Sequence, residues 1–448
     1  MINAGSVFSI LGNPNSRIPL AVKDFSATGG MTAGSFVTGK EEGFDRFIDE
    51  IGTEAIWLFG IPAFRMLFDK TAFKALGLDS KFDARNLKDK DVFEKIKQYA
   101  PTEDIKKNIE KIGLKEKLFK NAVSTKFVVS TALTVGSYLW LTKFKQKYTE
   151  KKIRENLINE YNEKKSLKNN SKQLDTSPLP SPQGEGAIVP SFKGIGPMVE
   201  SFAFSPVKNM WILDGFITGA RLKDSRSPQE FIGYAIKEAF TLCFMYYAGD
   251  KIQQYLEKRA MKKYNKTIGL DARVLESGDL KKTFDDGSIE KSLKEFKSAN
   301  TSSADLYEFL HKNPDNMIVK TAKTSGAISM YKEPQGLFKK AKVTDKIDTR
   351  EFIDLKEIEG INNKIEQLYK QYKEALSKGE TSEKFFAGVK KLKRGSILTN
   401  IGTCILALGV VTPGIMLLKR FTAKDDEEFQ TKKEIREQLI KEGVIERI

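Results

Sequence analysis

The longest uncharged run in the chain is Gly395–Leu418, which has 24 residues and is flanked by Arg394 on one side and Lys419 and Arg420 on the other. At about 1.5 Å of rise per residue, a helix of this length crosses the roughly 30 Å hydrocarbon core of a bilayer. The competing interpretation is a helix in the core of a soluble protein. The length of the run favours a membrane-spanning helix.

Three further segments are apolar enough to be helices of the same bundle. Residues 122–142 are uncharged from Phe127 onward and end near Tyr138 and Trp140, aromatic residues that are typical of a membrane interface. Residues 51–68 and 231–249 carry internal charges, so each of them could span, lie in the interface or be buried. The fold class predicted from the four segments is all-α, a helical membrane protein.

Small residues recur at every fourth position in the two strongest segments. Such a stripe lets helix backbones approach closely in lipid. The candidate helix-packing stripe consists of Gly395, Thr399, Thr403 and Ala407, together with Ala132 and Gly136.

Short matches between the two halves of the chain occur in the same order. They pair Phe36–Gly39 with Phe216–Gly219, residues 47–58 with 231–242, Gly77–Asp79 with Gly269–Asp271, and Ile153–Ile158 with Ile435–Ile440. Collinear matches indicate a tandem duplication. We therefore expect a first unit at residues 1–165 and a second at 201–448, each with two apolar segments, and a partly ordered insert at about 275–390. Two crossings per copy would keep the copies parallel.

The linker between these units is polar and rich in proline, serine and glycine over residues 166–200, a composition typical of flexible chain. Its stretch SPLPSPQGEG, Ser177–Gly186, resembles translated genomic repeats seen in bacterial proteins. The expected location is therefore a bacterial cytoplasmic membrane. In the insert, residues 358–375 have heptad spacing that suits a helical hairpin or a partner helix. Residues 316–352 leave room for one or two short strands.

The composition excludes several classes of site. The chain has a net charge of +16, a single histidine, His311, and two cysteines, Cys243 and Cys404. These numbers exclude a zinc site of several histidines and a disulfide scaffold. Gly34–Lys40 has the spacing of a phosphate-binding loop, but Glu41 occupies the position of its Ser or Thr. We expect no enzymatic activity, no metal and no cofactor.

One pair of carboxylates has two interpretations. Glu54 and Glu238 occupy matching positions of the two units, and Lys237 lies beside the second. Carboxylates at membrane depth are costly and mark ion or proton paths. The alternative, which we favour, makes both of them interfacial acids near helix N-termini, where the helix dipole stabilises them.

The leading hypothesis is a structural or partner-binding membrane component. Its expected partners are the lipid bilayer, including anionic lipids because lysines flank the strong segments on both sides, and a protein bound through residues 358–375. One alternative is a small transporter or channel-like protein with a polar path near Glu54, Lys237 and Glu238. The other is a basic helical protein that binds nucleic acid, which is disfavoured because aromatic and basic residues do not alternate.

Overall fold

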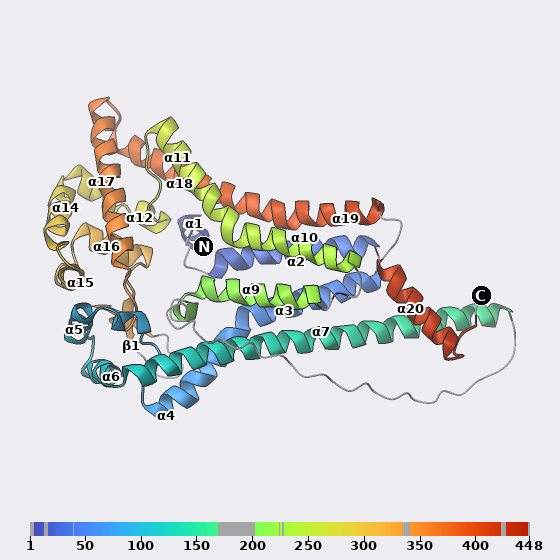
Figure 1. Cartoon of the computed structure of the whole chain (residues 1–448). Helices are drawn as coiled ribbons and strands as arrows, with labels where there is room; N and C mark the ends of the chain where they lie inside the picture. Colours follow the sequence, from blue (N-terminus) through green and yellow to red (C-terminus); the bar gives the residue numbers. More distant parts are fainter. Residues whose placement is uncertain are drawn as a thin grey trace.

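The computed structural model describes residues 4–12, 17–38, 40–168, 202–223, 225, 228–333, 335, 341–422 and 427–446. The described part is almost entirely helical (Figure 1), which confirms the all-α prediction. The linker predicted at 166–200 lies outside the described residues except for its first three, which are the end of a helix.

The long helices lie side by side in a bundle (Figure 1). They are α2 (Arg17–Thr38), α3 (Lys40–Phe68), α7 (Glu116–Lys168), α9 (Pro206–Lys223), α10 (Pro228–Leu242) and α19 (Thr412–Thr422). Helix α3 packs on α2 and α7, while α9 packs on α7 and α10. At the far end of α7, α20 (Glu427–Lys441) packs on it through Leu439, which meets Ile153 and Leu157.

Three π-helical turns each join two consecutive helices into one continuous helix. These turns are η1 (Asp69–Phe73) between α3 and α4 (Lys74–Leu76), η3 (Cys243–Tyr247) between α10 and α11 (Ala248–Tyr264), and η4 (Ala407–Val411) between α18 (Ser382–Leu406) and α19. Pro413 explains the last of them, because proline lacks the N–H that an α-helix would use. The Thr412 hydroxyl donates instead to the Ala407 carbonyl at 2.8 Å.

The shorter elements form a lobe at one end of the bundle (Figure 1). They are η2 (Ala84–Leu87), α5 (Lys90–Gln98), α6 (Glu103–Leu114), α12 (Ala272–Ser277), α13 (Asp279–Asp285), α14 (Ser288–Ala299), α15 (Ser303–Lys312), α16 (Met317–Ser325), β1 (Met330–Glu333), β2 (Lys342–Ile347) and α17 (Leu355–Ser377). The strands pair antiparallel, with Met330 opposite Ile347. Helix α1 (Ala4–Leu11) packs against α12 and α18.

The lobe differs from the predicted insert in one respect. Phe82, Ile96 and Phe119 of the first half share one hydrophobic core with Leu310 and Ile358 of the second. The predicted insert therefore shares its core with residues 82–119 of the first half. Because each half of the chain supplies only part of this core, the apolar residues of one half alone did not predict it.

The heptad at residues 358–375 is buried within this core. Ile358, Ile365 and Leu368 are fully buried, and Tyr372 is 4% exposed. Gly379 follows the end of this helix with a φ of +83°, a left-handed conformation that favours glycine. The seam is thus already covered by the chain itself, and a protein partner would need another surface.

Two helices among the described residues are long and apolar enough to cross a membrane, Gly43–Leu76 and Ser382–Leu418. They contain the predicted segments 51–68 and 395–418. The predicted segments 122–142 and 231–249 do not meet the same criterion. Hydroxyl residues and Lys126 lower the hydropathy of the former, and the pair Lys237–Glu238 interrupts the latter.

Within the described residues, only Ala407 of the predicted packing stripe lies at a buried helix contact, in η4 against α2. Gly395, Thr399 and Thr403 are exposed, and a side chain added at Gly395 or Gly136 would meet nothing within 4 Å. Ala407 is buried, whereas Ala132 borders an open apolar groove. Spacing of small residues alone could not tell which face of the helix points toward a neighbour.

Helix α2 and η4 approach each other closely through glycines. A methyl group at Gly30 would lie 2.2 Å from the carbonyl oxygen of Gly409, and one at Gly409 would lie 2.9 Å from that of Ser26. Backbone atoms cannot move aside as a flexible side chain can. Both positions therefore require glycine.

Gly30→Ala is expected to lower the free energy of unfolding by about 1–3 kcal/mol, because it overpacks this contact. Gly29→Ala is the matched control, since Gly29 is exposed with nothing within 4 Å of an added methyl group. On helix propensity alone, that control should be neutral or stabilising by up to about 1 kcal/mol. Thermal unfolding of the purified protein measures both, and equal melting temperatures would contradict the close approach.

Candidate functional site: a buried ion network

The polar face of α3 is turned into the bundle. Arg46, Glu50 and Glu54 recur at every fourth position, which places them on one side of a helix. Glu50 and Glu54 are 5% and 4% exposed, whereas Phe47, which lies between Arg46 and Glu50, is 45% exposed. This helix therefore buries charged side chains and exposes phenylalanines, the reverse of a helix in a water-soluble protein.

Arg221 of α9 is the centre of the network. Its Nη1 donates to Glu238 Oε1 at 2.5 Å, and its Nη2 donates to Asp49 Oδ2 at 3.4 Å. Its Nε donates to the Tyr138 hydroxyl at 3.0 Å, and Nη2 also donates to the Thr53 hydroxyl at 3.2 Å. The planar guanidinium can serve partners on four sides in this way.

Two lysines extend the network to the other helices. Lys237 of α10 donates to Glu50 Oε1 of α3 at 2.6 Å and lies 3.6 Å from Glu238 Oε1. Lys145 of α7 lies 3.5 Å from Asp49 Oδ1 and 3.7 Å from Asp45 Oδ2. One continuous set of ion pairs thus connects α3, α7, α9 and α10.

The charges of this set balance. Its cations are Arg46, Lys145, Arg221 and Lys237, and its anions are Asp45, Asp49, Glu50 and Glu238. Buried charges cost several kcal/mol each unless they are paired and hydrogen-bonded. Because each member has an opposite charge within 4 Å, the arrangement acts as an electrostatic clamp between helices.

Glu54 stands apart from this clamp. Its Oε1 accepts from the Thr28 hydroxyl of α2 at 2.9 Å, while Oε2 is buried without a hydrogen-bond partner. Asp24, also on α2, lies within hydrogen-bonding reach of it. The three residues predicted for a polar path therefore do not form one site. Lys237 and Glu238 belong to the clamp, and Glu54 lies outside it.

The structure places neither glutamate at the N-terminus of its helix. Glu54 lies near the middle of α3 and Glu238 in the last turns of α10, and they are 4% and 5% exposed. Helix α3 begins at Lys40 and α10 begins at Pro228, so both glutamates lie farther along their helices than the apolar pattern suggested.

Sequence reasoning missed Asp49, Lys145 and Arg221. A signal for Lys145 was present, because Tyr138, Thr142 and Lys145 share a helix face at spacings of four and three, and all three are buried. The adjacent Lys143 and Lys147 concealed it as part of a basic cluster. Arg221 is one of three basic residues in α9, and its partners all lie elsewhere in the chain, so only the fold identifies it.

The phosphate-loop spacing at Gly34–Lys40 does not form a loop. Residues up to Thr38 belong to α2, and Lys40 begins α3, whereas Gly39 lies outside the described residues. A helical backbone directs its N–H groups along its own axis, where they cannot surround a phosphate.

The single histidine is part of the lobe core. His311 stacks on Tyr99 with ring centroids 4.5 Å apart, and its Nε2 is buried without a hydrogen-bond partner. Burial, together with the charge of Lys323, lowers the pKa of His311 to about 4. The ring is therefore neutral and packs as an aromatic residue at pH 7.

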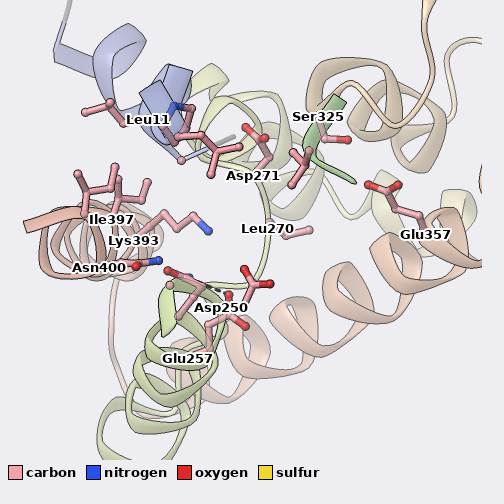
Figure 2. Close-up of a pocket in the computed structure, with 18 of the residues that line it drawn as sticks. Leu11, Asp250, Glu257, Leu270, Asp271, Ser325, Glu357, Lys393, Ile397 and Asn400 are labelled. Carbon is pink, nitrogen blue, oxygen red and sulfur yellow. Dashed lines mark hydrogen bonds between the residues drawn. The ribbon is translucent and has the colours of Figure 1, made fainter. Parts of the chain in front are cut away.

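A cavity of about 410 Å³ lies between the bundle and the lobe (Figure 2). Lys393 of α18 points into it and is 7% exposed, and Asp250, Glu257 and Asp271 lie across from it. Positive and negative groups thus face each other across the cavity. Within the described ranges, no three His, Cys, Asp or Glu side chains are arranged to hold a metal ion.

No protein-family model, curated protein or solved structure matches this chain.

Arg221→Leu is expected to destabilise the protein by about 3–5 kcal/mol, because it leaves Asp49 and Glu238 buried without their shared cation. Lys223→Leu is the matched control, since Lys223 is exposed on the same helix and should stay within about 0.5 kcal/mol of the parent. Chemical unfolding of both variants tests the clamp. A similar small effect of both would show that the network adds no stability.

The stability of the lobe should depend on pH through His311. The unfolded chain binds a proton near the ordinary pKa of about 6.5, but the folded chain does so only near 4. The contribution of neutral His311 to the free energy of unfolding is therefore fully present above pH 6.5, and it falls by about 3 kcal/mol as the pH drops to 4. His311→Phe keeps the ring and should remove this part of the loss. Hydrogen exchange in α15, compared between parent and variant at each pH, measures the difference.

Proposed function

We propose that this chain is an integral membrane protein whose bundle anchors the lobe at a membrane surface. The observation that carries the proposal is the inverted distribution of side chains in the bundle. Charged and hydroxyl residues are buried inside it beside an apolar cluster, and many large apolar residues are exposed on its outside. In a bilayer, polar groups must be hydrogen-bonded or ion-paired within the protein, while apolar side chains can face the surrounding lipid.

The outer surface of the bundle supports this proposal. Phe59 of α3, Trp140 of α7 and Leu418 of α19 are 67%, 68% and 66% exposed. Only 17% of the most apolar stretch within Gly43–Leu76 is buried, and 33% of that within Ser382–Leu418. A core helix of a soluble protein would be mostly buried, and continuous apolar surface of this kind is rare on soluble monomers.

The lobe follows the opposite rule. Its core residues, such as Phe82, Leu310 and Phe385, are fully buried, and its surface carries ion pairs such as Lys281 with Asp285. The contrast supports a lobe in water and a bundle in lipid. The lobe is then the part of the chain available to a soluble partner.

A tandem duplication remains part of the proposal. In each half, a helical hairpin is followed by a π-helical turn, first α2–α3 with η1 and then α9–α10 with η3. The two tails with matching sequences also pack on each other, Lys432 of α20 pairing with Glu160 of α7 at 3.2 Å. We propose that the bundle formed from two copies of one helical unit in a bacterial cytoplasmic membrane.

The structural role is preferred to transport because the clamp is saturated with opposite charges. A transporter or channel-like protein is the second candidate, favoured by Glu54, whose Oε2 has no partner. Ion or proton flux across liposomes containing the purified protein would favour transport. A nucleic-acid-binding protein is the third candidate, and it would expose the apolar faces of α3 and α19 to water.

Leu406→Arg and Val410→Arg test the membrane proposal directly. Both side chains point outward, at 56% and 60% exposure, so neither change disrupts packing inside the protein. In a bilayer, an arginine near the middle of a helix costs about 2.5–3.5 kcal/mol. We expect less membrane-inserted protein after carbonate extraction of cells expressing either variant.

Val343→Arg is the control, because Val343 is 58% exposed on the hairpin of the lobe and should leave insertion unchanged. Release of the parent protein by carbonate without detergent would reject the membrane proposal. Normal insertion of both bundle variants would also reject it.

A further inference from the structure

A second cavity, of about 780 Å³, lies on another side of the junction between bundle and lobe. Its wall combines residues of α3 and α7 with residues of η2, α16 and the hairpin. Seven basic and three acidic side chains line it. This charge excess distinguishes it from the cavity in Figure 2, where basic and acidic side chains face each other.

Some of the basic side chains are already neutralised by neighbours. Arg85 pairs with Asp83 at 2.7 Å, and Arg350 pairs with Asp348 at 2.7 Å. Lys126 pairs with Asp69 of η1. These pairs account for two of the three lining carboxylates and fix the wall of the cavity.

The other four basic side chains keep their charge available. In the described part of the chain, none of them forms an ion pair with a carboxylate. They are Arg65, Lys81, Lys323 and Lys332. Arg65 Nη2 donates to Asn209 Oδ1 at 3.1 Å, but its Nε is buried without a partner. Burial lowers the pKa of Lys323. Uncompensated cations in a partly dry cavity favour an anion there.

We propose that this cavity binds a phosphate-bearing anion. Arginine forks and lysine ammonium groups together match the oxygens of a phosphate. Val123 and Phe127 of α7, with Phe204 ahead of α9, give the same cavity an apolar side that suits an attached acyl chain. A phospholipid headgroup and a free phosphate compound share this chemistry. The lipid source rests on the proposed membrane function, whereas the free source does not.

Binding to the purified full-length protein in a neutral detergent tests the proposal, with two probes. One is phosphatidylglycerol in mixed micelles, measured by native mass spectrometry against phosphatidylcholine, and the other is inorganic pyrophosphate, measured by calorimetry. We expect at least one probe to bind, more weakly at high salt. Lys81→Ala combined with Lys323→Ala should weaken that binding about tenfold or more.

Lys356→Ala combined with Lys378→Ala is the matched control, since both lysines are exposed on or beside α17 and do not line the cavity. Lys332→Ala, on the exposed strand β1, provides an independent variant if the first pair fails to fold. Equal losses in cavity and control variants, or no binding of either probe, would overturn the proposal. Pyrophosphate binding by a protein that fails to insert would reject the membrane proposal and keep this one.

Discussion

The guanidinium of Arg221 is the group around which the bundle is organised. It contacts Asp49 and Glu238 and the hydroxyls of Tyr138 and Thr53, and it is only 5% exposed. An unpaired charge in such surroundings costs several kcal/mol. The hairpin α9–α10 must therefore dock on α3 and α7 in the register that supplies both carboxylates at once. A shift of either helix by one turn, about 5.4 Å, would separate the pairs.

Placing the charges inside determines the rest of the bundle. With its polar face turned inward, α3 presents Phe44, Phe47 and Phe59 outward. Beside the clamp, the interior holds an apolar cluster that includes Trp57 and Leu213, and at one place backbones approach as closely as those of Gly30 and Gly409. Hydroxyls such as that of Thr134, which donates to the Ser130 carbonyl at 2.7 Å, satisfy themselves on their own helix. Such local bonds need no water.

The sequence predicted the elements of this protein better than their orientation. Helix content and the strands within residues 316–352 follow from periodicity and from turn chemistry. Which face of a helix is buried does not, because the period of 3.6 is the same whether the apolar face meets a core or lipid. The stripe at Gly395 and Thr399 was therefore assigned inward, although both residues are exposed. The lobe core was missed because it unites segments far apart in the chain.

The candidate site shows the same limit. Lys237 and Glu238 were recognised because charges inside an apolar segment are conspicuous, but Lys145 and Arg221 lie at segment ends where charges are common. Their role depends on partners brought by other helices.

The saturation of the clamp also bears on function. A transport path needs groups that can release one partner and take another, and their binding energies must stay moderate. In the clamp, removing a cation deprives a buried carboxylate of one of its ion-pair partners, so each exchange would cost free energy. Glu54, with Asp24 beside it and one oxygen unpartnered, is the group that could take up a proton without breaking an ion pair. A clamp that resists exchange fits the proposed role of a bundle that anchors the lobe. At the junction of the two, Arg65 and Lys323, which form no ion pair with a described carboxylate, leave a positive cavity for the proposed phosphate-bearing anion.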